Sequence, residues 1–340
     1  MALKLFSTDI AIDLGTANTL IWSKGEGVKL NEPTIVAYDK ASNRPIAIGN
    51  AAQNMIGRTP RGIEVIRPMK DGAIANFEIA EAMLRHFIKE ASSTWQPAKR
   101  IVVCVPSGIT DVEKRAVRDA CEHAGAKEVH LIAEPMASAI GMGINVHEPI
   151  GNMVVDIGGG TTEIAVISLS GIAEHESIKI AGDEMTSAVV QYFKRSQNLF
   201  IGDRTAEIIK CQVGSAMPLE EELTIEVRGR DLVSSIPKMI KVSSADIREA
   251  LMTSVKLIVD AILILLEKTP PELSADILDR GIMLSGGGAL LKGLDDRIKK
   301  ETNLPVHIAE EPLTTVVRGT GKVLENLSEY SSVLIKSNRF

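Results

Sequence analysis

Apolar residues recur along the chain with two periods, one typical of strands and the other of helices. The runs 101–105 and 129–133 are mostly apolar and contain β-branched residues, which predicts two strands. The segment between them has helical periodicity and begins with the signature of a capping box, Thr110 followed by Glu113. The order strand, helix, strand predicts a βαβ unit, and with it an α/β fold in which helices cover sheets.

Helical periodicity also marks 79–88 and 247–265, where apolar residues lie three or four positions apart. The stretch 255–266 is the most apolar of these, but Lys256 and Asp260 interrupt it, and it is too short to span about 30 Å of hydrocarbon. We therefore expect a buried helix there.

An internal repeat is the most informative pattern. Residues 10–21 align with residues 153–164 at a constant offset, and Asp, Gly, Thr and Ile recur in register. Each copy consists of an apolar strand, an Asp, a glycine-containing turn with Thr or Asn, and a second apolar stretch. This order predicts two β-hairpins with polar tips that can face each other.

The predicted tips have the composition of a phosphate-binding turn. Glycine lets backbone N–H groups approach an anion, and Thr or Asn side chains add hydrogen-bond donors. We expect the two hairpins to clamp one triphosphate, with Asp13 and Asp156 placed to hold magnesium, mostly through water. The alternative is that each Asp-x-Gly only turns the chain, but two copies in register favour the phosphate-binding interpretation.

A third glycine cluster, Gly286 to Gly288, lies between the apolar strand 281–284 and a predicted helix start at 289–291. This order indicates an anion or nucleotide site at a helix N-terminus. The cluster does not fit the dinucleotide pattern, because Leu291 occupies the position of the third glycine. Gly321-Lys322 lacks the upstream glycine of a P-loop, so that class is also disfavoured.

Composition narrows the function classes further. With 340 residues, we expect two domains or one deeply cleft body. A net charge of -6 without a basic face disfavours nucleic-acid binding. Cys104, Cys121 and Cys211 suggest neither a disulfide framework nor a zinc site. The N-terminus has neither a signal-peptide nor a transit-peptide pattern, and we expect a cytoplasmic protein.

Four motifs together resemble the superfamily of actin, sugar kinases and heat-shock chaperone ATPases. They are similar to its first phosphate motif, its second phosphate motif, its adenosine motif and its connecting helix, at 13–20, 156–164, 284–293 and 134–141. Finer stretches resemble the MreB family of bacterial actins, at 31–33, 66–69, 181–185 and 268–273. The resemblance covers nearly the whole chain and the motifs occur in the superfamily's order.

The resemblance implies the actin-like ATPase fold, with two duplicated ribonuclease H-like domains that carry smaller inserted subdomains around a nucleotide cleft. The implied boundaries are 1–31, 74–143 and 316–340 for subdomain IA, 32–73 for IB, 144–178 and 244–315 for IIA, and 179–243 for IIB.

The resemblance also implies roles for individual residues. Glu134 orients the attacking water with help from Thr161. The phosphates contact Gly15, Thr16, Ala17, Asn18, Gly158, Gly159, Gly160 and Thr161, and the adenosine contacts Gly182, Glu207, Lys210, Gly286, Gly287, Gly288 and Leu290. Two alternatives stay open: Glu134 could merely cap the helix before Pro135, and Glu207 with Lys210 could be a plain surface ion pair.

The function implied is that of a slow ATPase that uses ATP and Mg²⁺ and assembles into double filaments. Such filaments lie on the inner face of the cytoplasmic membrane, contact membrane-embedded elongation-complex proteins, and direct cell-wall synthesis and rod shape. Leu5, Phe6 and Trp95 are candidates for lipid contact. Alternatively, Leu5-Phe6 begins the first strand and Trp95 covers a neighbouring helix.

Two other classes share the phosphate motifs. A sugar-type kinase would need a substrate base in the cleft, and no motif identifies one. A chaperone ATPase would need a peptide-binding domain, for which we expect no room after the adenosine motif.

Overall fold

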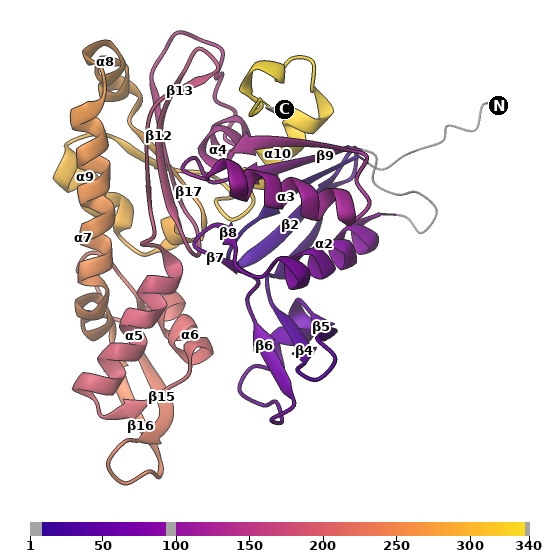
Figure 1. Ribbon diagram of the computed structural model, residues 1–340. Helices are drawn as coiled ribbons and strands as arrows, with labels where there is room; N and C mark the ends of the chain where they lie inside the picture. Colours follow the sequence, from indigo (N-terminus) through magenta and orange to yellow (C-terminus); the bar gives the residue numbers. More distant parts are fainter. Residues whose placement is uncertain (1–8, 93–99, 337–340) are drawn as a thin grey trace.

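The computed structural model describes residues 9–92 and 100–336, and two five-stranded sheets form its centre (Figure 1). The first sheet has the order β10-β9-β1-β2-β3 and the second the order β13-β12-β11-β17-β18. In each, three antiparallel strands follow one another, and the first of them also pairs in parallel with a later strand. The two sheets therefore share one topology, as the sequence repeat predicts.

The strands of the first sheet are β1 (Ile10–Leu14), β2 (Asn18–Ser23), β3 (Gly27–Pro33), β9 (Arg100–Val105) and β10 (Glu128–Ala133). Those of the second are β11 (Asn152–Ile157), β12 (Thr162–Ser168), β13 (Gly171–Ile178), β17 (Ile282–Ser285) and β18 (Val306–Ile308). The predicted strands at 101–105 and 129–133 are β9 and β10, and the two predicted hairpins are β1–β2 and β11–β12.

Helices cover the outer faces of both sheets. On the first sheet these are α2 (Phe77–Ala91) and α3 (Asp111–His123), and beside the second are α7 (Ser244–Lys268), α8 (Pro271–Arg280) and α9 (Leu294–Thr302). The helices α5 (Gly182–Ser196) and α6 (Asp203–Val213) pack against α7 and against the small sheet that contains β14 (Leu199–Phe200) and β15 (Thr224–Asp231). The predicted capping box starts α3, because Thr110 Oγ1 accepts from the backbone N–H of Glu113 and the Glu113 carboxylate accepts from that of Thr110. The apolar stretch 255–266 lies within α7, and no helix in the described ranges is long and apolar enough to cross a bilayer.

Two helices lie between the sheets and join the halves. Alternate residues of β1 and β11 face away from the outer helices and pack on α4 (Glu134–Gly141) and α10 (Thr315–Glu325). The two helices approach closely at Gly319, which has no Cβ. A Cβ added there would lie only 1.8 Å from the carbonyl oxygen of Ala137, so glycine is required at this position. Lys322 Nζ donates to the carbonyl of Ile140 at 3.0 Å and so caps α4.

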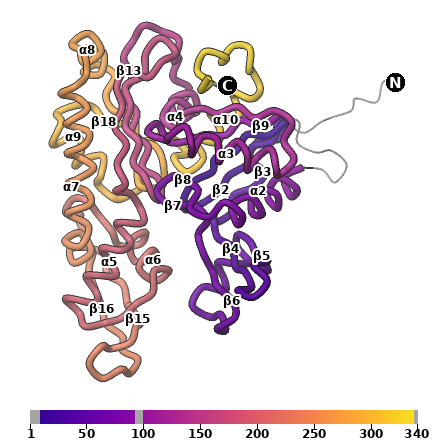
Figure 2. Tube along the Cα trace, in the orientation of Figure 1, coloured from indigo at the N-terminus to yellow at the C-terminus, as the bar shows by residue number. Residues whose placement is uncertain are grey.

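Two smaller sheets project from the same end of the molecule, one from each half (Figure 2). The first contains β4 (Val36–Asp39), β5 (Arg44–Ile48) and β6 (Ile63–Ile66), with α1 (Asn50–Gln53) against it. The short pair β7 (Met69–Lys70) and β8 (Ala73–Ile74) lies apart from this sheet, near α3. The second contains β14 (Leu199–Phe200), β15 (Thr224–Asp231) and β16 (Pro237–Ser243). The four subdomain boundaries given above stay predictions.

One predicted element is wrong. Residues 287–290 form a single 3-10 turn, Gly287–Leu290, and the next α-helix begins only at Leu294. Gly286 has φ 78° and Gly293 has φ 71°, so the chain takes left-handed backbone just before the 3-10 turn and again just before α9. The third glycine cluster is thus not the N-terminus of an α-helix.

Candidate functional site

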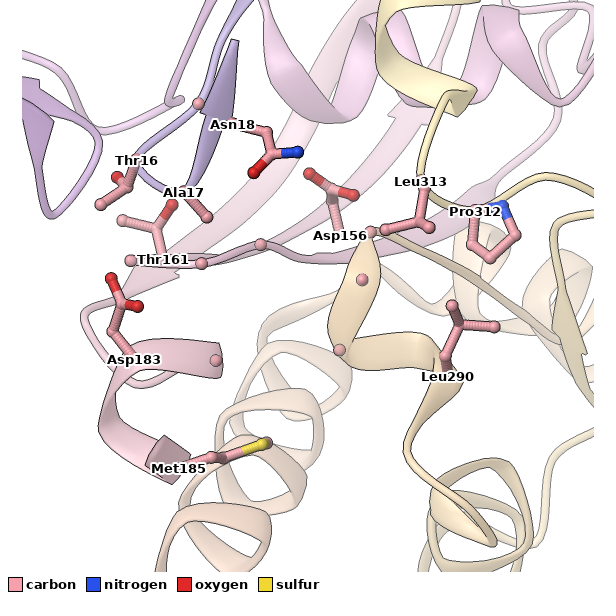
Figure 3. Close-up of a pocket in the computed structure, with 18 of the residues that line it drawn as sticks. Thr16, Ala17, Asn18, Asp156, Thr161, Asp183, Met185, Leu290, Pro312 and Leu313 are labelled. Atoms are coloured by element: carbon pink, nitrogen blue, oxygen red, sulfur yellow. The ribbon is translucent and has the colours of Figure 1, made fainter. Parts of the chain in front are cut away.

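A cavity of about 580 Å³ opens between the two hairpins, which is a usual size for a small-molecule site (Figure 3). Every phosphate, adenosine, metal and catalytic residue expected from the sequence lines this cavity. The residues come from segments as far apart as β1, α4, β11, α6 and the 3-10 turn after β17. Leu5, Phe6 and Trp95 lie outside the described residues, so the expectation of lipid contact stays a prediction.

The tips of the two hairpins lie against each other and both line this cavity (Figure 3). A Cβ built on Gly159 would lie 2.6 Å from the Cβ of Ala17, and one on Gly160 would lie 2.7 Å from Oγ1 of Thr16. Real side chains do not approach so closely, so only glycine permits the two turns to meet. Thr34 Oγ1 donates to the carbonyl of Gly15 at 2.8 Å and holds the first turn in place.

Asp13 and Asp156 are each the last residue but one in the first strand of their hairpin, and both line the cavity. Burial raises the pKa of Asp13 to about 6 and that of Asp156 to about 7. Ser285 Oγ donates to Asp156 Oδ1 at 2.7 Å. Ser138 of α4 lies 2.6 Å from Ser285 Oγ, so a buried hydrogen-bond chain connects Asp156 to α4.

Glu134 is the first residue of α4 and is 8% exposed. The N-cap residue is Ala133 and no side chain caps this helix, so Glu134 does not have the capping role considered above. Burial raises the pKa of Glu134 well above its usual range, and the nearby charges of Glu163, Asp13 and Asp156 add to that increase.

This concentration of carboxyl groups fits a divalent cation. Asp13, Glu134 and Asp156 converge on one cavity, and the pKa of each carboxyl group is raised chiefly by burial. Within the part of the chain that the structure describes, no group of three or more His, Cys, Asp or Glu side chains is placed to coordinate a metal directly. Magnesium suits such a site, because it keeps several waters and takes one or two carboxylates.

The far end of the cavity is formed by the start of α5, by α6 and by the glycine cluster. Lys210 Nζ lies 2.7 Å from Glu207 Oε2 and donates to the carbonyl of Gly182 at 2.9 Å. The Lys210 side chain is only 12% exposed, so this pair is not a plain surface ion pair. Gly288 is needed for packing, since a Cβ there would lie 2.2 Å from Cγ2 of Ile157.

Some lining residues were not predicted from the sequence. Arg67 Nη1 and Asp183 Oδ1 form an ion pair of 2.7 Å that connects a segment of the first half to the start of α5 in the second. Pro312 and Leu313 add an apolar wall (Figure 3). Arg67 and Asp183 lie in stretches that resemble the MreB family, but neither stretch has a chemical pattern that would identify a partner.

Comparisons with known proteins agree with this geometry. The profile of the MreB/Mbl protein family matches residues 7–332. The chain is 51% identical over 336 residues to the cell shape-determining protein MreB of Escherichia coli (strain K12), with 97% of each chain covered. It is 50% identical over 326 residues to the cell shape-determining protein Mbl of Bacillus subtilis (strain 168), covering 96% of this chain and 98% of that protein.

Solved structures show the same fold. MreB 5 of Spiroplasma citri bound to AMPPNP is 38% identical and superposes with a TM-score of 0.90, covering 95% of this chain and 97% of that one. A double helical filament of MamK is 22% identical with a TM-score of 0.82, covering 94% and 99%, and at this identity it supports the fold alone.

Proposed function

The chain belongs to the MreB/Mbl family of bacterial cell-shape proteins, and from this premise we propose that it is a slow ATPase whose filaments assemble on the inner face of the cytoplasmic membrane and direct cell-wall synthesis and rod shape. The observation that carries the proposal is the pair of matched glycine turns that meet and together line one cavity. The relative from Spiroplasma citri was solved with AMPPNP, which supports ATP as the ligand.

The proposed chemistry begins with positioning of the triphosphate. Backbone N–H groups of the two turns, with Thr16 and Asn18, would bind its oxygens, and Asp13 and Asp156 would hold magnesium through water. When bound, that ion would neutralise phosphate charge and lower the pKa values of the nearby carboxyl groups. Glycine at 159 and 160 lets the turns close from both sides.

Hydrolysis would depend on Glu134. Its carboxyl group lies in the cavity at the start of a buried helix, where it can orient a water molecule toward the terminal phosphate with help from Thr161. A single acid-base group contributes about 10²–10⁴ in rate, which suits a slow ATPase that times filament turnover.

The adenosine would bind between α6 and the 3-10 turn, against Gly182, Glu207, Lys210 and Leu290.

Filament formation follows from a head-to-tail contact that does not close on itself. The decisive test is sedimentation across protein concentration with ATP, with ADP and without nucleotide. We expect a pellet above a critical concentration with ATP, together with phosphate release, and less pellet with ADP. A sugar-type kinase would stay in the supernatant and release phosphate in proportion to an added acceptor, and that result would contradict the proposal.

Replacing Gly159 with Ala should weaken AMPPNP binding by about tenfold or more, because the added Cβ would lie 2.6 Å from the Cβ of Ala17 and separate the two turns. Binding is measured by calorimetry below the assembly concentration. Gly62→Ala is the matched control, since nothing lies within 4 Å of its added Cβ. Equal affinity of Gly159→Ala and wild type would show that the turns need not meet.

Membrane attachment is proposed for the apolar groups Leu5, Phe6 and Trp95. Few apolar groups bind one subunit weakly, but a filament multiplies the contacts. Trp95→Ser should reduce co-flotation of filaments with anionic vesicles by about threefold or more and leave pelleting without lipid unchanged. Unchanged co-flotation would remove Trp95 from the proposal.

A further inference from the structure

A buried carboxylate next to the cavity joins the two halves of the molecule. Glu163 lies in β12, is fully buried, and accepts a hydrogen bond from Ser177 Oγ of β13 at 2.5 Å. Its other oxygen accepts from the backbone N–H of Ser107 at 2.9 Å. Ser107 belongs to the turn between β9 and α3 in the first half, whereas β12 and β13 belong to the second. One side chain therefore binds both halves.

The stability of this arrangement depends on both donors. Ser107 and Ser177 offer neutral donors, and burying a carboxylate is costly when its oxygens are not fully hydrogen-bonded. If the halves moved apart, the Ser107 N–H would leave, and the Glu163 oxygen that it contacts would lose that hydrogen bond. The contact thus favours the closed arrangement.

The turn that Glu163 holds lies against the groups proposed to act on phosphate. A Cβ built on Gly72 would lie 2.6 Å from Cγ of Pro106 and 3.4 Å from Cγ2 of Thr161. The backbone N–H of Gly72 in turn donates to Thr16 Oγ1 at 3.0 Å. One packed cluster therefore contains the turn at 106–108, the Gly72 loop and both hairpin tips. Glu163 of β12 contacts this cluster through its hydrogen bond from Ser107.

We propose that Glu163 is a positioning residue that couples closure of the two halves to ATP hydrolysis, by holding the 106–108 turn against the second phosphate hairpin. The inference rests on the proposed ATPase function. In the closed protein Ser107 reaches Glu163, Pro106 packs beside Gly72, and Thr161 and Thr16 are set around the phosphates. Glu163 does not line the cavity, so it positions the site through Thr161 and the turn, and its charge also reaches the nearby Glu134 carboxyl group.

Two substitutions separate this role from a general structural one. Glu163→Ala removes both acceptors and should slow phosphate release at saturating ATP by about 10- to 100-fold, because small misplacements of reacting groups cost this much. Its AMPPNP affinity should stay within about threefold of wild type, since the hairpin tips keep their own contacts. Glu163→Gln keeps an acceptor for Ser107 and a partner for Ser177, and should restore most of the rate. Glu174→Ala, on neighbouring β13, is the matched control and should behave as wild type.

Hydrogen exchange at the Ser107 amide tests the contact without catalysis. In the wild-type protein this amide should exchange about tenfold more slowly with AMPPNP than without, and Glu163→Ala should abolish the difference. If Glu163→Ala does not fold, the exchange rates of the Ser107 amide in the wild-type protein with and without AMPPNP still test the proposal. Two results would overturn the proposal. One is an exchange rate of the Ser107 amide that is the same with and without AMPPNP, and the other is phosphate release by Glu163→Gln that is as slow as that of Glu163→Ala.

The two proposals fail in different ways. If the wild-type protein neither binds AMPPNP nor hydrolyses ATP, the ATPase function is wrong. If it does both and Glu163→Ala hydrolyses ATP at the wild-type rate, only the role of Glu163 is wrong.

Discussion

Asp156→Asn should lose magnesium-dependent ATP binding by about 100-fold or more and, without nucleotide, should be more stable than the wild type at pH 8. The loss of binding follows because one of the two carboxylates proposed to hold magnesium is removed. Asn keeps the size of the side chain and an oxygen that can accept from Ser285 Oγ, so packing is preserved. Binding is measured by titration of ATP with and without magnesium.

The gain in stability follows from the raised pKa. The Asp156 carboxyl has a folded pKa of about 7 against an ordinary value of 3.8, so the folded protein holds its proton more tightly than the unfolded chain does. Stability is therefore lost as pH rises from about 4 to about 7, and Asn removes that loss, which is a few kcal/mol at most. Thermal unfolding of the nucleotide-free protein at pH 5 and pH 8 measures it.

Asp231 provides a control of opposite sign. Hydrogen bonds, first from the backbone of Ser234, lower the pKa of Asp231 to about 2. Its charge therefore stabilises the fold above about pH 4, and Asp231→Asn should lower the unfolding temperature while ATP binding is unchanged. An Asp156→Asn protein that unfolds earlier than wild type at pH 8, or that binds ATP with magnesium normally, would contradict the assigned role.

Glu134→Gln should bind ATP with near wild-type affinity but release phosphate about 10²–10⁴-fold more slowly, because the amide cannot take part in proton transfer from the attacking water. Its filaments should form with ATP and persist, since hydrolysis would no longer time their disassembly. Single-turnover phosphate release and the decay of light scattering measure the two effects.

Ser138→Ala is the matched control on the same helix. It removes the hydroxyl that contacts Ser285 one turn after Glu134, without changing a group proposed to act on water. We expect a modest change in ATP affinity and a hydrolysis rate much closer to that of wild type. Normal phosphate release by Glu134→Gln would assign the water-orienting role to another residue.

The parts of the site that lie within short segments could be predicted from the sequence. The Asp, the glycine turn and the flanking strands of each hairpin are adjacent in the chain, and the repeat in register showed that there are two of them. The helix expected at 289–291 was wrong, because two left-handed glycines enclose the segment and leave room for one 3-10 turn only. The order of residue types did not reveal those backbone angles.

Contacts between the halves could not be predicted. Arg67 and Asp183 are 116 residues apart in the chain, and Ser107 and Glu163 are 56 apart. Each pair exists only because α4 and α10 set one sheet against the other, and single-sequence periodicity does not report that packing. The donor at Ser107 is a backbone N–H, which every residue except proline has, so the residue type at 107 does not indicate this hydrogen bond. The contact of Glu163 could therefore be found only in the structure.

A crystal structure of the protein with AMPPNP and magnesium would show whether two matched turns close over one polyphosphate. We expect backbone N–H groups of Gly15 to Asn18 and of Gly158 to Thr161 within about 3 Å of phosphate oxygens. We also expect the ion near Asp13 and Asp156. A phosphate chain that contacted only one of the two turns would show that the proposed nucleotide site is wrong.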